Sequence, residues 1–316
     1  MKISLFPPVL HKGDTIGVIA PAGHVANLDR FNRGVQILHE MGFEVKFPRN
    51  FWPGHGYLAD TDDNRGREFN VMYSDPEVKA LIALRGGYGC IRMIGRIDLE
   101  MIRRNPKPVI GFSDITILLN YLFARTGLVS FHGPVATSLG DSSRDTLERL
   151  YLSLTGGWSH PIPAKDVEIL KKGPKATAPV VGGNLASLVA LLGTPYDFSW
   201  DEKIVLLEDV NEPAYKIDRM LTQLQLAGKF DRIAGLILGD FSISQHSHTE
   251  RLGYLEMIWN RALEILGGRS LPVWGNFPSG HCPGNLTIPL GAVAEMEGDR
   301  PMLSFITPRN IGGYDI

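Results

Sequence analysis

The sequence has 316 residues, 44% of them hydrophobic, which is enough to bury one large core or two medium ones, and its net charge of −2 is too small to attract nucleic acid or an anionic membrane. Its two cysteines, Cys90 and Cys282, cannot form a disulfide framework and have no CxxC spacing for zinc, which favours a reducing compartment. No apolar run approaches the roughly 18 residues of a membrane span, and Pro7 and Pro8 interrupt the N-terminal apolar stretch, so we expect a soluble cytoplasmic protein.

The first half of the sequence alternates between short apolar runs and stretches with helical spacing. The runs end in glycine, proline or polar residues, as buried strands do, and apolar residues at helical spacing lie between them. In chain order, we predict strands at residues 15–20, 43–47, 78–84, 108–112 and from 129, and helices around residues 31–38, 61–73 and 115–123. Repeated strand–helix units with short connections predict a doubly wound parallel sheet.

The pattern weakens between about residues 140 and 179, where Ser, Asp, Gly, Pro and Lys dominate, and we interpret this stretch as the crossing between domains. Beyond it we predict helices around residues 185–192, 217–224 and 249–266, strands at 204–207 and 234–238, and short strands within 286–306. The sequence therefore predicts an α/β protein: an N-terminal doubly wound parallel-sheet domain (1–150), a linker (151–175) and a C-terminal α/β domain with a β-rich tail (176–316).

Residues 111–114 (GFSD) lie between a predicted buried strand and a strongly amphipathic helix. In α/β proteins, functional side chains gather at such carboxyl ends of strands, and a serine there has the setting of a nucleophile elbow. The match to G-x-S-x-G is partial, because Ile115 replaces the second glycine. Ser113 is thus a candidate nucleophile, and the alternative is that Ser113 or Asp114 only caps the helix.

Residues 85–89 (RGGYG) follow the predicted strand at 78–84. Glycines there let backbone N–H groups point at an anion or a developing oxyanion. The alternatives are a phosphate-binding turn and a plain tight turn. A nucleotide site is poorly supported, because neither G-x-x-x-x-G-K-[ST] nor a full G-x-G-x-x-G is present.

Glu208 and Asp209 directly follow the apolar run at 204–207, where a buried carboxylate needs a partner, although a surface turn is the simpler interpretation. The base that a serine mechanism requires is best supplied by His281, in the Gly/Pro-rich segment 279–284. His132, just after a strand, is better explained as a structural histidine or pocket wall. His246 and His248 form an H-x-H pair without an evident third metal ligand, so we expect them to be solvated.

Taken together and in this order, these segments resemble the LD-carboxypeptidases of serine peptidase family S66. The resemblance extends over nearly the whole chain, from residues 19–23 (IAPAG) to residues 289–291 (PLG). Each segment alone is weak, but the ordered set is specific. The segments between these ends are residues 85–89 (RGGYG), 111–114 (GFSD), 182–185 (GGNL), 207–209 (LED), 218–221 (DRML) and 280–281 (GH).

The resemblance implies a catalytic triad in which Ser113 is the nucleophile, His281 the base and Glu208 the acid that orients His281. It places the serine on the first domain and the other two residues on the second. Glu212 is a competing carboxylate, and we prefer Glu208 because it ends the predicted strand, as in the family pattern.

The resemblance also implies that the glycine loop forms the oxyanion hole, for which we choose the N–H groups of Gly87 and Asp114. Arg85, Gly86 and Tyr88 of the same loop are expected to contact the substrate. Arg85 would bind a free carboxylate, and the alternative is a surface arginine paired with an acid.

The substrate that the resemblance implies is a murein tetrapeptide, cut between meso-diaminopimelate and the terminal D-alanine. No metal and no cofactor is expected, and neither nucleic acid nor membrane is an expected partner. The family resemblance also implies a homodimer.

Three other functions remain open. A relative in the same family that hydrolyses a peptide–nucleotide antibiotic, as microcin-immunity proteins do, would favour an aromatic residue that stacks on a base. Trp158 is a candidate, although covering an edge of the core is its simpler role. The others are a non-catalytic two-domain protein that binds a small ligand, which we expect to carry a secretion signal, and a nucleotide-dependent α/β enzyme, which lacks its phosphate loop here.

Overall fold

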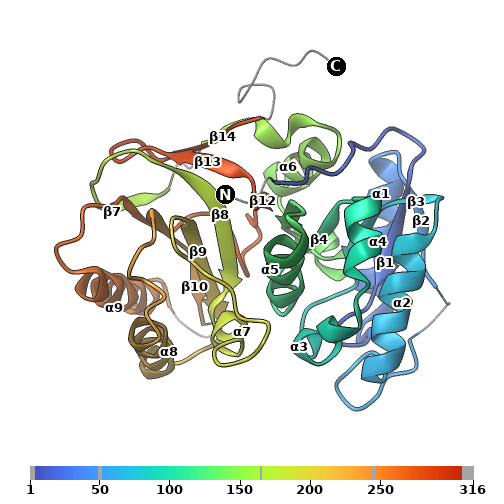
Figure 1. The fold of residues 1–316 in the computed structure, drawn as a ribbon, viewed down its shortest axis with the longest axis horizontal. Coiled ribbons are helices and arrows are strands. Elements are labelled where there is room, and N and C mark those ends of the chain that lie inside the picture. The colour runs from blue at the N-terminus through green and yellow to red at the C-terminus, as the bar shows by residue number, and fades with distance from the viewer. Residues whose placement is uncertain (1–3, 49–51, 164–165, 244–246, 308–316) are drawn as a thin grey trace. The chain divides into compact units, whose positions relative to one another are not determined.

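The structure is a computed structural model that describes residues 4–48, 52–163, 166–243 and 247–307. The chain divides into two compact units (Figure 1), Met1–Trp158 with Pro283–Gly291, and Ser159–Cys282 with Ala292–Ile316. No helix among the described residues is both long and apolar enough to span a bilayer.

The first unit is built on a sheet whose strand order is β12-β5-β4-β3-β1-β2. Strands β1 to β5 run parallel, and β12, which comes from the C-terminal part of the chain, pairs antiparallel with β5. The strands are β1 (Thr15–Ile19), β2 (Glu44–Lys46), β3 (Val78–Ala83), β4 (Val109–Gly111), β5 (Ser130–His132) and β12 (Ile288–Leu290).

The helices of this unit are α1 (Leu28–Glu40), α2 (Asp62–Ser74), α3 (Cys90–Met93), α4 (Leu99–Arg104), α5 (Ile115–Thr126) and α6 (Arg144–Leu154), with short 3₁₀ turns η1 (Ile94–Arg96) and η2 (Ala136–Asp141). Figure 1 shows α2, α4 and α5 on one face of the sheet. The order of β2, β1, β3, β4 and β5 reverses between β1 and β3, and ligands of doubly wound folds bind outside the carboxyl ends of the strands at such a reversal.

Burial explains why the strand predictions for this unit were reliable. In β3 all residues except Lys79 are buried, and β4 and β5 are buried throughout. A strand covered on both faces needs a continuous apolar run, which is visible in a sequence. Helix α5 ends at Gly127, whose positive φ of 83° closes the helix in a left-handed conformation.

The second unit contains a curled mixed sheet with the order β6-β14-β13-β8-β9-β10-β11-β7. Strands β8 to β11 are parallel, and β13, β14, β6 and β7 add antiparallel edges. The strands are β6 (Ile162–Pro163), β7 (Glu168–Lys171), β8 (Ala176–Asn184), β9 (Ile204–Val210), β10 (Gly235–Ser242), β11 (Val273–Gly275), β13 (Val293–Met296) and β14 (Met302–Phe305); the helices are α7 (Leu185–Val189), α8 (Ala214–Leu226) and α9 (His248–Leu266).

The predicted α/β class with a β-rich tail is confirmed, with two differences in detail. The stretch from 140 to 179, where we predicted no regular element, contains α6, β6, β7 and the first four residues of β8. The N-terminal sheet is parallel except at one edge, because the first strand of the tail, β12, pairs with β5. Local composition hid these elements, since β8 contains Pro179 and two glycines, which weaken a strand signal.

Gly34 provides a test of packing in the first unit. A methyl group at this position of α1 would lie 1.9 Å from the carbonyl oxygen of Ala136. We expect Gly34→Ala to lower the free energy of unfolding by about 1–3 kcal/mol, because the helix would have to move away from η2. Gly253→Ala in α9 is the matched control, since nothing lies within 4 Å of the added methyl. Its free energy of unfolding should rise by up to about 1 kcal/mol, because alanine has the higher helix propensity. Equal effects in denaturant titrations would contradict this packing.

Candidate active site

Ser113 lies in a strained turn between β4 and α5. Its φ is 63°, in the left-handed region that non-glycine residues rarely adopt. Its carbonyl accepts a hydrogen bond from Thr116 N (2.9 Å), which starts the helix. A methyl group on Gly111 would lie 2.7 Å from Cγ2 of Ile115, the first residue of the helix, so position 111 requires glycine. This is the backbone geometry of a nucleophile elbow, reached with Ile115 in place of the second glycine.

The glycine loop at residues 85–89 lies directly against Ser113. A methyl group on Gly86 would be 2.6 Å from Cβ of Ser113, so only a hydrogen fits there. Gly87 has a φ of 122°, which glycine adopts without strain. Within the described part of the chain, the N–H groups of Gly87 and Asp114 donate no hydrogen bond. Both amides are therefore available to an oxyanion.

The Asp114 side chain does not cap α5. Its Oδ2 instead accepts a hydrogen bond from the N–H of Cys90 (2.8 Å), at the end of the glycine loop. Burial raises the pKa of Asp114, and the hydrogen bonds from Cys90 offset part of that rise. Asp114 is 4% exposed, so this contact is internal and links the Ser113 turn to the loop.

Arg85 and Tyr88 complete the loop. The guanidinium group of half-buried Arg85 donates to the carbonyl of His24 (3.3 Å), and no acid pairs with it among the residues that the structure describes. The contact of Arg85 with a substrate carboxylate stays a prediction. Tyr88 is 46% exposed, and its ring centroid is 5.8 Å from that of Tyr57, which is 62% exposed.

Glu208 and His281 meet in the second unit. Oε2 of Glu208, at the carboxyl end of β9, is 2.8 Å from Nδ1 of His281. The Glu208 side chain is fully buried and the His281 side chain is 20% exposed. The contact involves Nδ1, and in a Ser-His-acid triad Nε2 is the ring nitrogen that exchanges a proton with the nucleophile.

The loop that carries His281 is built around Glu208. Gly280 has a φ of 119°, and a methyl group there would lie 2.7 Å from Oε2 of Glu208. On the neighbouring strand β10, Asp240 N donates to the carbonyl of Ser279 (2.8 Å). The close approach of loop and strand requires glycine at 239 as well, since a methyl group would be 2.5 Å from the same carbonyl.

Two further buried acids, Asp209 and Asp240, lie close enough to affect His281. Asp209 accepts hydrogen bonds from Asn184 Nδ2 (3.0 Å) and Ala186 N (2.9 Å). Burial, followed by the charge of Glu208, raises its pKa to about 6. Asp240 accepts from Ser242 Oγ (2.8 Å) and Arg251 Nη2 (3.0 Å). Neither residue was predicted from the sequence to have a role.

These acids favour the protonated form of the His281 ring. Burial of the ring lowers the pKa of His281, but the charge and hydrogen bond of Glu208, with the charges of Asp209 and Asp240, outweigh burial and raise that pKa above its ordinary value. The site thus stabilises the imidazolium that forms when His281 accepts a proton. The signal for Asp240 was present in the sequence, since residues 234–240 (AGLILGD) repeat the pattern of an apolar run followed by an acid.

Three other candidate residues, Glu212, His132 and Trp158, have structural partners. Glu212 forms an ion pair with Lys216 (3.3 Å). His132 is buried on β5, edge-on to Phe112 with ring centroids 6.2 Å apart. Trp158 stacks on Phe6 at 4.9 Å and packs against the core of the first unit.

His246 lies outside the described residues. Among the residues that are described, no group of three or more His, Cys, Asp or Glu side chains is arranged to hold a metal ion.

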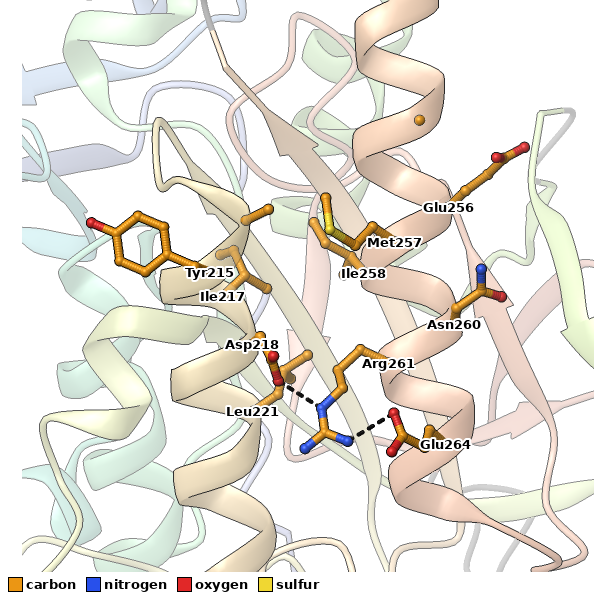
Figure 2. Close-up of a pocket in the computed structure, with 12 residues that line it drawn as sticks. Tyr215, Ile217, Asp218, Leu221, Glu256, Met257, Ile258, Asn260, Arg261 and Glu264 are labelled. Carbon is orange, nitrogen blue, oxygen red and sulfur yellow. Dashed lines mark hydrogen bonds and ion pairs between the residues drawn. The ribbon is translucent and has the colours of Figure 1, made fainter.

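A groove of about 870 Å³ between α8 and α9 is separate from these residues. Figure 2 shows Arg261 between Asp218 and Glu264, with Tyr215 and Met257 further along the groove. Neither Glu208 nor His281 lines it.

Comparisons with known proteins identify the family of the chain. Residues 16–133 match the LD-carboxypeptidase N-terminal domain and residues 177–296 match the LD-carboxypeptidase C-terminal domain. The chain is 36% identical to a probable murein peptide carboxypeptidase of Bacillus subtilis, over 92% of this chain and 91% of that protein. It is 31% identical to the murein tetrapeptide carboxypeptidase of Pseudomonas aeruginosa, over 90% and 94%.

Two solved structures are similar over most of their length. A muramoyltetrapeptide carboxypeptidase from Oxalobacter formigenes has a TM-score of 0.76 and 29% identity, covering 93% of this chain and 99% of that one. The protein MccF in complex with glutamyl sulfamoyl guanosine has a TM-score of 0.84 and 25% identity, covering 95% and 98%.

The Glu208–His281 contact can be tested by titration. We expect NMR to give a pKa for His281 above the ordinary 6.5, and Glu208→Gln to lower it, because the substitution removes the negative charge next to the ring. Glu212→Gln is the matched control and should leave this pKa unchanged, since Glu212 pairs with Lys216. An unchanged His281 pKa in Glu208→Gln would mean that this carboxylate does not interact with the ring.

Proposed function

The chain belongs to the LD-carboxypeptidase family of serine peptidases, family S66, and on that premise we propose that it hydrolyses the amide bond between meso-diaminopimelate and the terminal D-alanine of murein tetrapeptides. The observation that supports hydrolysis most strongly is the contact between the buried Glu208 and His281. The choice of substrate rests on the murein peptide carboxypeptidases among the relatives.

In the proposed reaction, Ser113, His281 and Glu208 form the triad. His281 Nε2 accepts the hydroxyl proton while Ser113 Oγ attacks the carbonyl carbon of the scissile amide. Glu208 holds the ring by Nδ1 and stabilises the imidazolium. This requires that the two units bring Ser113 Oγ within hydrogen-bond reach of Nε2 in the working enzyme.

The negative oxygen of the tetrahedral intermediate is stabilised by the N–H groups of Gly87 and Asp114, each contributing about 3 kcal/mol to lowering the barrier. The carbon–nitrogen bond then breaks, and His281 gives its proton to the amine of the departing D-alanine. A water molecule, deprotonated by His281, attacks the acyl ester, and the shortened peptide leaves with Ser113 restored.

Arg85 is the residue that we assign to the carboxylate of the terminal D-alanine. Its guanidinium group lies in the same loop as Gly87, and no acid of the described chain neutralises it. A planar guanidinium group suits a carboxylate, and a carboxypeptidase must recognise a free C-terminus. Gly86 and Tyr88 flank the oxyanion amide and are proposed to contact the same end of the substrate. As the family resemblance implies, we further propose a cytoplasmic homodimer.

The second candidate is hydrolysis of an aminoacyl sulfamoyl nucleoside. It is favoured by the similarity to MccF, whose solved complex holds glutamyl sulfamoyl guanosine. Against it stands the position of Trp158, which stacks on Phe6 rather than offering a free ring to a nucleobase.

A direct substrate comparison distinguishes the two candidates. We expect the purified protein to release D-alanine from a murein tetrapeptide and to leave glutamyl sulfamoyl adenosine intact over the same period, both followed by liquid chromatography. A tetrapeptide with a D-configured centre on the carbonyl side of the scissile bond is the matched control and should not be cut. Faster cleavage of the nucleoside than of the tetrapeptide would replace the murein proposal by the second candidate.

Ser113→Ala tests the nucleophile. D-alanine release should fall by about 10⁴-fold or more, because the base then has no hydroxyl to activate. The unfolding temperature should stay close to that of the wild type. Ser142→Ala removes a similarly half-buried hydroxyl, which donates to the carbonyl of Ser138 (3.0 Å), and should keep full activity. Substantial turnover in Ser113→Ala would reject the nucleophile assignment.

A further inference from the structure

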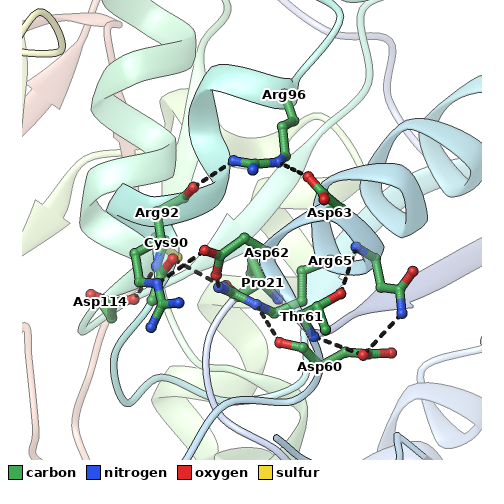
Figure 3. A network of polar contacts seen from close by, with 12 residues as sticks. Pro21, Asp60, Thr61, Asp62, Asp63, Arg65, Cys90, Arg92, Arg96 and Asp114 are labelled. Atoms are coloured by element: carbon green, nitrogen blue, oxygen red, sulfur yellow. Dashed lines mark hydrogen bonds and ion pairs between the residues drawn. The ribbon is translucent and has the colours of Figure 1, made fainter.

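Arg65, in the first turn of α2, is a charged side chain enclosed by backbone carbonyls. The residue is 1% exposed. Its Nε donates to the carbonyl of Asp60 (3.1 Å), and its Nη1 donates to the carbonyls of Gly89 (2.9 Å) and Pro21. Nη2 pairs with the Asp62 carboxylate at the protein surface. Figure 3 shows the guanidinium group at the centre of this network.

The three carbonyls come from three separate connections of the first unit. Pro21 follows β1, Asp60 precedes α2, and Gly89 ends the glycine loop that follows β3. Since β1 and β3 are the neighbouring strands at which the order of the sheet reverses, Arg65 joins the loops on both sides of that reversal. A buried charge is costly unless its hydrogen bonds are satisfied, so the arginine and the three loops fix one another.

The glycine loop is held at its other points by the Ser113 turn. Cys90 N donates to the Asp114 carboxylate, and Gly86 packs directly against Ser113. Gly86 also accepts a hydrogen bond from Gly23 N (3.3 Å). The amide of Gly87 thus lies between a segment attached to Ser113 and a segment attached to Arg65.

We propose that Arg65 is a positioning residue for catalysis: by holding the carbonyl of Gly89, it fixes the oxyanion-binding amide of Gly87 relative to Ser113. This proposal rests on the proposed function, in which that amide stabilises the tetrahedral intermediate. Arg65 does not touch the reacting atoms. Its effect passes through the backbone of residues 85–89, and small displacements of such groups reduce rates strongly.

The shape of the guanidinium group explains why arginine is suited to this position. Its donors are arranged in a rigid planar fork, so one side chain reaches three carbonyls that diverge in direction. An ammonium group on a flexible stem cannot reproduce that arrangement. Gly89 is adapted to the fork as well, because its φ is 130° and a methyl group there would lie 2.8 Å from Nη1 of Arg65.

The test compares Arg65→Lys with Lys107→Met, using release of D-alanine from a murein tetrapeptide. Lys107 is also buried (4% exposed) and donates from Nζ to a backbone carbonyl, that of Asp75 (2.6 Å), but it precedes β4 and so lies at the opposite end of this strand from Ser113. Both variants lose buried hydrogen bonds to carbonyls. Unfolding temperature, kcat, KM and the pH profile of kcat/KM are measured for each.

For Arg65→Lys we expect kcat to fall roughly 10- to 100-fold, with KM within about twofold of wild type and the acid limb of the pH profile unchanged, because His281 is untouched. Lys107→Met should have a lower unfolding temperature and a wild-type kcat. If Arg65→Lys yields no folded protein, Gly89→Ala replaces it, since the added methyl displaces the loop from Arg65 while the arginine stays, and the same fall in kcat is expected.

A wild-type kcat in the folded Arg65→Lys variant, or in Gly89→Ala where that variant carries the test, would overturn the proposal. So would an equal loss of kcat in Lys107→Met, because the effect would then be a general consequence of destabilisation. Wild-type protein and Ser113→Ala are assayed in parallel. An inactive wild type or an active Ser113→Ala would reject the proposed function itself, whereas active wild type, inactive Ser113→Ala and unimpaired Arg65→Lys would reject only the role of Arg65.

Discussion

Ser113 occupies a left-handed backbone conformation, and its neighbours are arranged so that this conformation persists. A non-glycine residue there costs roughly 1–2 kcal/mol, which the surrounding contacts have to supply. Gly111 leaves room for Ile115, Gly86 leaves room for Ser113 itself, and Asp114 holds the far end of the glycine loop through Cys90. The turn therefore constrains the choice of residue at several positions far apart in the sequence, and it sets the place of both amides proposed to bind the oxyanion.

In the second unit, the determining feature is a balance of burial and charge around His281. Burial alone would favour the neutral ring, but Glu208 at 2.8 Å and the nearby Asp209 and Asp240 favour the cation. Burial of Asp209, followed by the charge of Glu208, raises the pKa of Asp209 to about 6. The negative charge of one acid therefore disfavours ionisation of the other. A base whose protonated form is stabilised suits the step in which it accepts the serine proton.

The sequence was informative where a physical requirement is local. Buried parallel strands need continuous apolar runs, which predicted β1, β3, β4 and β9, and the residues just after such runs include Ser113 and Glu208. It was uninformative where tertiary pairing overrides propensity. Strand β8 lies between β9 and β13 although Gly182 and Gly183 both have positive φ. Arg65 left no signal of its role, because the partners that tie it to the glycine loop are backbone carbonyls of distant segments, those of Pro21 and Gly89.

The most direct test of the proposed triad and oxyanion hole is an experimental structure of the Ser113→Ala protein with a bound murein tetrapeptide. We expect the scissile carbonyl carbon to lie within about 3.5 Å of the position of the missing hydroxyl, with its oxygen facing the N–H groups of Gly87 and Asp114 and its leaving nitrogen facing Nε2 of His281. A peptide bound elsewhere, such as in the groove between α8 and α9, or a scissile carbonyl turned away from both amides, would contradict this expectation.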